Sequence, residues 1–185
     1  MTSKRPLFLI LFCIFTLCYF DLQTEMGTGK ARAHSNLALM YYKVGRYAEA
    51  KEQCLISIQK DPKAPHAYIN LGAVLVVEKN YDEAIKVFNK VLELDPGDRA
   101  AYFNLGRIYY KTGRLEEAAH EFWKVAKCGH ADLESVAWND IGVIRAQQGR
   151  HRDALAAFEN AIKVDKTNAE AIKNYREFIR FHKEV

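Results

Sequence analysis

The chain has 185 residues, of which 49% are hydrophobic, enough for one globular domain with a sizeable core and too many for a disordered protein. Its formal net charge is +4, but four bases and two acids lie in the first 33 residues, which leaves only +2 for the remainder. This mild charge argues against nucleic acid as a partner.

The N-terminus combines two basic residues with a long apolar run. Lys4 and Arg5 precede the run, and Leu7 to Phe20 comprises fourteen residues without a formal charge. This pattern is typical of a secretory signal. As a helix the run would span about 21 Å, short of the roughly 30 Å of bilayer hydrocarbon, which favours a signal peptide over a full transmembrane helix.

The residues after the run contain no small-x-small pair that would mark a cleavage site. For residues 1–22 we therefore keep open a cleaved signal peptide, an uncleaved signal anchor and a lipid anchor at Cys18. The positive-inside rule leaves the N-terminus in the cytoplasm, so we expect an exported protein, membrane-anchored or periplasmic, that contacts the membrane only through this segment. Residues 23–30 indicate a flexible linker.

The segment from Pro65 to Asp98 carries two apolar stripes with helical spacing. Between them, Glu78 to Asn80 is polar, and Asn80 can take the left-handed conformation that closes a helix. Pro96 cannot continue the second helix. The segment therefore predicts a helix, a tight turn and a second helix. The stripes are Tyr68, Leu71, Gly72 and Leu75, then Ala84, Val87, Phe88, Val91 and Leu92.

The same pattern recurs every 34 residues. The fourth copy begins two residues late, because Leu133 and Glu134 are inserted before it. We predict four repeats, over residues 31–64, 65–98, 99–132 and 135–168. The matching residues are Leu37, Ala38, Tyr41, Ala50 and Pro62 in the first, Tyr102, Leu105, Gly106, Tyr109, Ala118 and Phe122 in the third, and Trp138, Ile141, Gly142, Ala154, Phe158 and Ala161 in the fourth.

A 34-residue helix-turn-helix period with aromatic, Leu-Gly, aromatic, Ala, Phe and Pro at these offsets resembles the tetratricopeptide repeat family. The resemblance implies an all-α protein, a right-handed α-solenoid of four helix-turn-helix repeats with a C-terminal capping helix over residues 169–185. The departures from the family pattern fall mostly in the terminal repeats: His34, Cys54, His130, Arg145 and Lys166.

Glycine interrupts the first helix of repeats two to four, where it costs about 1 kcal/mol relative to alanine. We expect close approach by an alanine of the paired helix to compensate, and a phenylalanine to fill the space between repeats. The helix glycines are Gly72, Gly106 and Gly142, the alanines of the paired helices are Ala84, Ala118 and Ala154, and the phenylalanines are Phe88, Phe122 and Phe158. In the capping helix we expect Ile172, Tyr175 and Ile179 to share the inward face.

The family resemblance also implies a concave groove along the first helices, which commonly holds an extended peptide or a partner helix. The groove positions are not needed for the core, so their apolar side chains predict a strip that binds a protein or peptide. The candidate residues are Asn36, Leu39, Ile69, Asn70, Phe103, Asn104, Arg107, Tyr110, Lys111 and Val143.

Two features of this groove have alternative explanations. The recurring asparagines can pair with the backbone of a ligand, or they can tie neighbouring helices together. Arg107 and Lys111 can receive a carboxylate, or they can form a solvated basic face. Some relatives bind the C-terminus of a chaperone through a two-carboxylate clamp. The corresponding positions of this chain match the clamp only at asparagine, so we predict no chaperone clamp. These positions hold Ser35, Leu39, Asn70, Ala100 and Asn104.

The sequence contains no phosphate-binding loop, no nucleophile motif and no pair of ligands at metal spacing. We expect no catalytic residues, no metal site and no cofactor. The predicted function is that of an exported or membrane-tethered scaffold that serves the assembly of an envelope complex. The alternatives are a self-associating structural repeat protein and an accessory subunit of an envelope enzyme or electron-transfer system that uses Cys128.

Overall fold

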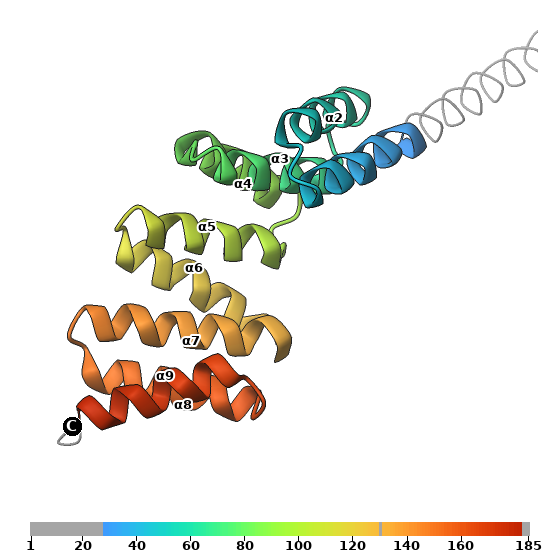
Figure 1. Ribbon diagram of the computed structural model, residues 1–185. Coiled ribbons are helices and arrows are strands. Elements are labelled where there is room, and N and C mark those ends of the chain that lie inside the picture. Colours follow the sequence, from blue (N-terminus) through green and yellow to red (C-terminus); the bar gives the residue numbers. More distant parts are fainter. Residues whose placement is uncertain (1–27, 130, 183–185) are drawn as a thin grey trace, which may run out of the picture. The chain divides into compact units, whose positions relative to one another are not determined.

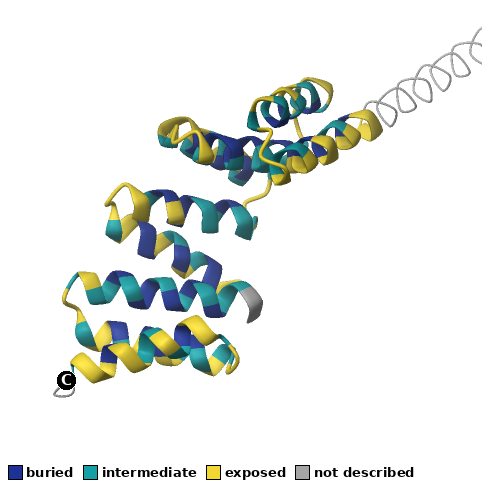
Figure 2. Cartoon of the chain, viewed as in Figure 1, coloured by how far each residue is buried: buried dark blue, intermediate teal, exposed yellow. Residues whose placement is uncertain are grey.

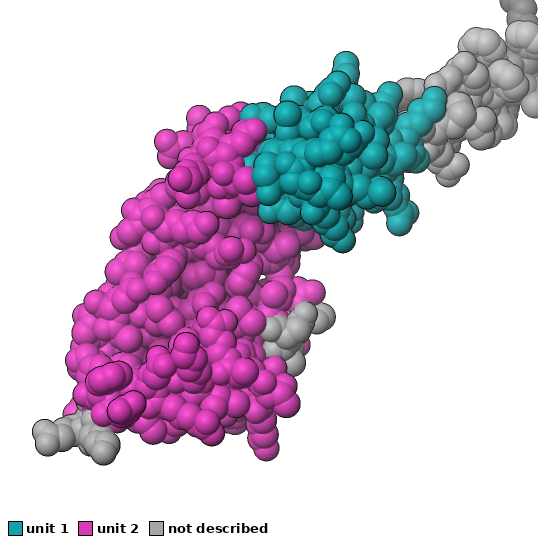
Figure 3. Space-filling view, viewed as in Figure 1, with its two compact units in different colours: residues 1–74 teal, residues 75–185 magenta. Residues whose placement is uncertain are grey.

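A computed structural model describes residues 28–129 and 131–182. The chain divides into two compact units, residues 1–74 (unit 1) and residues 75–185 (unit 2), which Figure 3 distinguishes by colour. The expected signal or anchor segment, residues 1–22, lies outside the described residues. Within the described part, no helix is long and apolar enough to span a membrane.

Unit 1 contains a helix over residues 28–43, α2 (Tyr47–Lys60) and most of α3 (Pro65–Val77), which continues across the boundary (Figure 1). Small residues bring the first two helices together. Ala31, Ala50 and Cys54 are fully or almost fully buried. Ser57 is also buried, and its hydroxyl donates a hydrogen bond of 2.7 Å to the carbonyl oxygen of Ala31. The first helix pair is therefore held by close backbone approach.

Unit 2 contains five consecutive helix contacts. Each helix packs against the next, and α7 also contacts α9 (Figure 1). Figure 2 shows that the buried residues of these helices gather on the faces turned toward one another. The described residues form helices and no strand, so the all-α prediction is confirmed. The helices are α4 (Tyr81–Leu94), α5 (Arg99–Lys111), α6 (Leu115–Lys127), α7 (Ala131–Gln147), α8 (His151–Val164) and α9 (Ala169–Phe181).

The turns inside the helix pairs share one hydrogen-bond pattern. In the turn between α5 and α6, Gly113 has φ of 78°, its N–H bonds the carbonyl of Tyr110 at 3.1 Å, and the N–H of Arg114 bonds the carbonyl of Tyr109 at 2.8 Å. This is a Schellman motif, in which a left-handed residue lets the last carbonyls of a helix find donors. The same position is held by Gly45 and by Gly149 in two other turns, with φ of 79° and 69°.

The turn between α3 and α4 carries the left-handed residue one position earlier than predicted. Lys79 has φ of 60°, whereas Asn80 has φ of −83° and precedes the first residue of α4. The expectation for Asn80 was therefore wrong. Its side chain instead donates a hydrogen bond of 2.7 Å to the carboxylate of Glu83. Lysine carries a Cβ, so this turn pays a conformational cost that the glycine turns avoid.

A phenylalanine ring packs directly on the helix glycine in each complete pair of unit 2. A Cβ placed on Gly106 would lie 2.9 Å from Cε1 of Phe122, and one placed on Gly142 would lie 2.5 Å from Cε1 of Phe158. Both rings are 2% exposed. The compensation for glycine is thus contact with the ring of the paired helix, whereas we had expected contact with Ala118 or Ala154.

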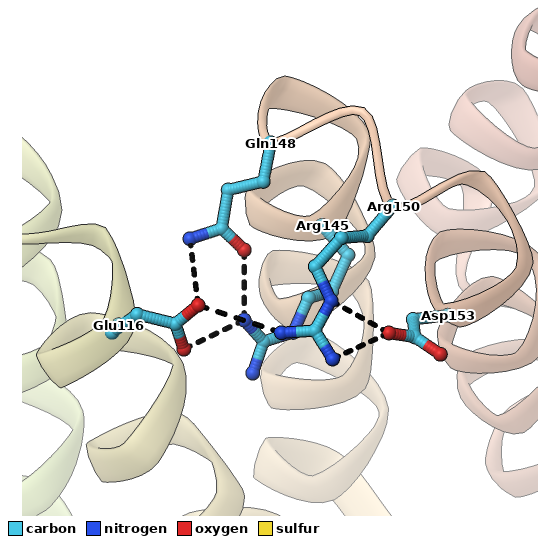
Figure 4. Close-up of polar contacts among 5 residues, drawn as sticks. All are labelled: Glu116, Arg145, Gln148, Arg150 and Asp153. Carbon is cyan, nitrogen blue, oxygen red and sulfur yellow. Dashed lines mark hydrogen bonds and ion pairs between the residues drawn. The ribbon is translucent and has the colours of Figure 1, made fainter.

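Arg145 occupies a normally apolar position, and the structure supplies its partners (Figure 4). Its Nη1 donates to Oε2 of Glu116 at 2.8 Å and to Oε1 of Gln148 at 2.7 Å. Arg150 also reaches Glu116, at 3.4 Å, and its Nε donates to Asp153 at 2.7 Å. The hydrogen bond from Arg145 holds the pKa of Glu116 below its ordinary value. A polar network therefore joins α6 to the turn between α7 and α8.

The capping helix α9 buries a different residue from those predicted. Phe178 is 7% exposed and its ring centroid lies 5.7 Å from that of Phe158, whereas Ile179 is 39% exposed. Tyr175 packs against the same cluster, as expected. The inward face is thus centred on Ala171 and Phe178, because the helix is rotated from the register that the sequence suggested.

Replacing Gly106 by alanine should destabilise the chain, although alanine is the better helix former. The new Cβ would have to displace the Phe122 ring, and such overpacking costs about 1–3 kcal/mol. Urea denaturation of the full chain measures this change. In a Phe122→Leu background the clash is absent, so the same substitution should cost much less. An equal cost in both backgrounds would contradict the packing described here.

Lys79→Gly should raise the free energy of unfolding by about 0.5–1 kcal/mol. Glycine accepts the left-handed conformation without strain, which stabilises the folded state. This stabilisation exceeds the destabilisation that comes from the greater entropy of glycine in the unfolded chain. The matched control is Gly113→Lys, which places lysine at the same position of the next turn and should destabilise. Thermal denaturation measures the sign of the stability change in both variants. Two changes of the same sign would show that the turns are not equivalent.

Candidate functional site

Four predicted groove residues lie in unit 1. Asn36, Leu39 and Asn70 line a hollow of about 570 Å³, and Ile69 is half-buried. The side-chain amide of Asn70 donates to the carbonyl oxygen of Ser35 at 2.9 Å and to its hydroxyl at 3.2 Å. Of the two explanations for the asparagines, the structure therefore shows that Asn70 ties α3 to the helix over residues 28–43. Leu39 is 40% exposed and remains open to a partner.

Unit 2 contains a second, smaller pocket, of about 250 Å³. Its walls come from α5, α7 and the first turn of α9, with one ring of α6 in contact with it. Four candidate groove residues line it, namely Arg107, Tyr110, Lys111 and Val143, together with four residues outside the candidate set, namely Phe122, Asn139, Asp140 and Glu170. The first helices of successive repeats therefore do converge on one hollow within this unit.

Two apolar groove residues also belong to the core, which corrects the expectation that the core does not need them. Phe103 is half-buried, and its ring meets that of Phe122 edge-on, with the centroids 5.5 Å apart. Val143 is half-buried against the cluster formed by Ala154, Phe158 and Phe178. Asn104 donates to the carbonyl of Ala100 in its own helix, at 2.8 Å. Substitution of Phe103 or Val143 would therefore disturb the core.

The rim of the pocket is exposed. Tyr110 is 36% exposed, and its hydroxyl accepts a hydrogen bond of 2.5 Å from the side-chain amide of Gln147. This bond joins α5 to α7 and fixes the ring at the edge of the pocket. Arg107 and Lys111, one turn apart on α5, are exposed beside it. The rim thus presents an anchored aromatic ring and two cations.

Asp140 lines the pocket but is not among the candidate site residues named from the sequence. Its carboxyl group is half-buried in the pocket, and burial, followed by the nearby charge of Glu170, raises its pKa to about 6. Arg107 and the Asn139 amide act in the opposite direction. Asn139 is itself 2% exposed and accepts a hydrogen bond of 2.9 Å from Asn174. The pocket therefore holds a carboxyl group that burial makes costly to ionise.

A comparison among the repeats would have found this residue. The position held by Asp140 in the fourth repeat is asparagine in the first three and in the capping helix: Asn36, Asn70, Asn104 and Asn174. Asn174 ties α9 to α7 in the way that Asn70 ties α3 to the helix over residues 28–43. An aspartate here replaces a neutral amide by an ionisable group, so the fourth repeat departs from the internal pattern at this position.

Other reactive side chains form no comparable site in the described residues. Cys54 is buried, and burial raises the pKa of its thiol to about 12. Cys128 is exposed, and its thiol donates to the carbonyl of Lys124 at 3.1 Å. Nowhere in residues 28–129 and 131–182 do three or more His, Cys, Asp or Glu side chains gather as metal ligands.

The paired helices and Schellman turns define a helical-repeat protein with a pocket on its first helices. Models of the tetratricopeptide repeat match residues 35–99, 75–127 and 135–168, which together make up more than half of the chain. The chain belongs to the tetratricopeptide repeat family. No curated protein matches its sequence.

Solved structures share the fold at low sequence identity. A structure of PilF from Pseudomonas aeruginosa is 21% identical, with a TM-score of 0.77, and the match covers 85% of this chain and 72% of that one. YrrB, described as a tetratricopeptide repeat protein with an unusual peptide-binding site, is 22% identical, with a TM-score of 0.68 and coverage of 89% and 84%. PilW, described as a widely conserved type IV pilus biogenesis factor, is 19% identical, with a TM-score of 0.73 and coverage of 83% and 70%.

Asp140→Asn should stabilise the folded chain at about pH 8 by about 1–3 kcal/mol. The pKa of Asp140 is raised from 3.8 to about 6, so above pH 6 the carboxylate is charged in both states but loses hydration only in the folded state, which destabilises folding. As the pH falls through 6 toward 4 this cost disappears, and the two proteins should converge in stability. Urea denaturation at several pH values measures the difference.

The control is Glu159→Gln, which removes an exposed carboxyl group from α8. It should leave stability within about 0.5 kcal/mol at every pH. If Asp140→Asn were neutral at pH 8, or if its effect did not depend on pH, the carboxyl group would not be held in a costly environment.

Proposed function

We propose that this protein is a non-enzymatic scaffold that binds a protein or peptide partner, with the pocket of unit 2 at the centre of its binding surface. The observation that supports this most directly is the convergence of Arg107, Tyr110, Lys111 and Val143 on one pocket, because the repeat pattern alone predicts that these residues face a shared groove. Membership of a repeat family built for display of such surfaces is consistent with it.

The chemistry of the pocket suits an extended segment of a partner. Tyr110 offers a large ring that is already held by Gln147, so little side-chain entropy is lost when a partner covers it. Aromatic and arginine side chains at the centre of an interface carry much of its binding energy. The hollow of unit 1, with Leu39 exposed beside Asn36, offers a second and more polar contact surface.

We further propose that the four repeats, residues 31–64, 65–98, 99–132 and 135–168, are exported and act in the assembly of an envelope complex. Support comes from the basic and apolar N-terminal segment, whether it is cleaved or retained. The description of PilW as a pilus biogenesis factor is consistent with a role in assembly. Fractionation of cells that produce the full chain tests this proposal, and recovery of the protein from the cytosol would contradict it.

Crosslinking followed by pull-down from native membranes should recover a partner with the unaltered full chain, and Tyr110→Ala should reduce the recovery at least about tenfold. Tyr110 is exposed and outside the core, so this substitution removes contact area without opening a cavity. The matched control is Trp123→Ala, which removes an exposed aromatic ring from α6 that does not line the pocket of unit 2.

Circular dichroism of both variants establishes that they remain folded. The proposal predicts that the partner is retained by the Trp123 variant and lost by the Tyr110 variant. The opposite result would move the binding surface to the outer face of α6, and retention by both variants would remove the pocket from consideration.

A further inference from the structure

We infer that the pocket of unit 2 selects a partner segment that carries a lysine or arginine, whose cationic head pairs with the carboxylates of Asp140 and Glu170. Its aliphatic stem would lie against Tyr110 and Val143, which supply the apolar part of the lining. The inference rests on the proposed function, because it names the chemistry of the segment that the same pocket would bind.

The two carboxylates lack a cation of their own. Asp140 projects from α7 and Glu170 from the first turn of α9, and both line the pocket. In the part of the chain that the structure describes, neither carboxylate forms an ion pair with a Lys, Arg or His side chain. Arg107, on α5, is near enough to favour the charged form of Asp140, but its guanidinium lies 6.0 Å from the Phe103 ring centroid and forms no such pair.

Of the charged side chains that line the pocket, Asp140 is half-buried, whereas Arg107, Lys111 and Glu170 are exposed. Arg107 and Lys111 are exposed, so a carboxylate that joined them would form a surface ion pair, which contributes little to binding. Asp140 is half-buried and has already lost part of its hydration in the free protein. A cation that enters the pocket therefore gains a strong electrostatic interaction without a further large desolvation of Asp140.

The distribution of charge also orients the segment. The groups that face Asp140 are Arg107, Tyr110 and Lys111 from α5, Asn139 from its own helix and Glu170 from α9, while α6 contributes only the ring of Phe122. The cations thus lie along α5 and the carboxylates along α7 and α9. A bound segment would direct its lysine or arginine toward α7 and α9, and its carbonyl or acidic groups toward α5.

The repeat pattern supports a selective role for the carboxylate. Asparagine holds the equivalent position elsewhere, and Asn70 and Asn174 there tie two helices together, so the fold itself does not require an acid at this position. A residue that costs stability without a structural need is characteristic of a functional site.

Selection of random peptides displayed on phage against the purified full chain tests the inference. The enriched peptides should share a lysine or arginine, and replacing it by norleucine, which keeps the stem and removes the charge, should weaken binding at least about tenfold. On Asp140→Asn the same replacement should change the affinity less than about threefold, because only the exposed carboxylate of Glu170 remains to pair with the cation. Glu159→Gln should behave like the unaltered chain.

The outcomes separate this inference from the proposed function. Two outcomes would overturn the inference and leave peptide binding intact. In the first, the enriched peptides share an acidic residue. In the second, replacing the lysine or arginine by norleucine weakens binding equally to the unaltered chain and to Asp140→Asn. Failure to enrich any peptide above the level captured by an unrelated helical-repeat protein would contradict both. Since Asp140→Asn is expected to be at least as stable as the unaltered chain, a loss of discrimination in that variant would not reflect unfolding.

Discussion

The contact between a phenylalanine ring and a helix glycine determines how each helix pair of unit 2 is built. Phe122 on Gly106, and Phe158 on Gly142, bring two helices closer than side chains at the glycine position would allow. Because this packing fixes how α5 and α7 are rotated, it also fixes the position of the pocket, which Phe122 lines together with Arg107, Tyr110 and Asp140. The pocket is therefore a consequence of the core, and its rim residues are held without contributing to the core themselves.

The helices and their pairing were predictable from the sequence, because apolar residues at helical spacing recur at a fixed period and proline and glycine mark the ends of the units. Details that depend on tertiary contacts were not predictable. Lys79 takes a conformation that lysine rarely adopts, since the turn is imposed by the helices on both sides of it. The rotation of α9 that buries Phe178 in place of Ile179 depends on contacts with α8, which a single helix pattern does not contain.

The candidate groove residues were likewise predictable in part. Their positions on the first helices followed from the repeat, and four of them do line the pocket of unit 2. The double role of Phe103, in the core and beside the groove, and the environment of Asp140 depend on how far neighbouring helices bury a side chain. The sequence did contain one sign of Asp140, its departure from the asparagine of the other repeats, but only the structure gives that departure a physical cost.

The central claim is that a partner is bound on the face of unit 2 that carries this pocket. Incorporation of a photo-crosslinking amino acid at position 110 of the full chain, followed by irradiation of cells, tests the claim directly, with incorporation at position 123 as the comparison. The account predicts a discrete crosslinked partner from position 110 and none from position 123. Crosslinks from position 123 alone would place the binding surface on the outer face of α6 and contradict the account.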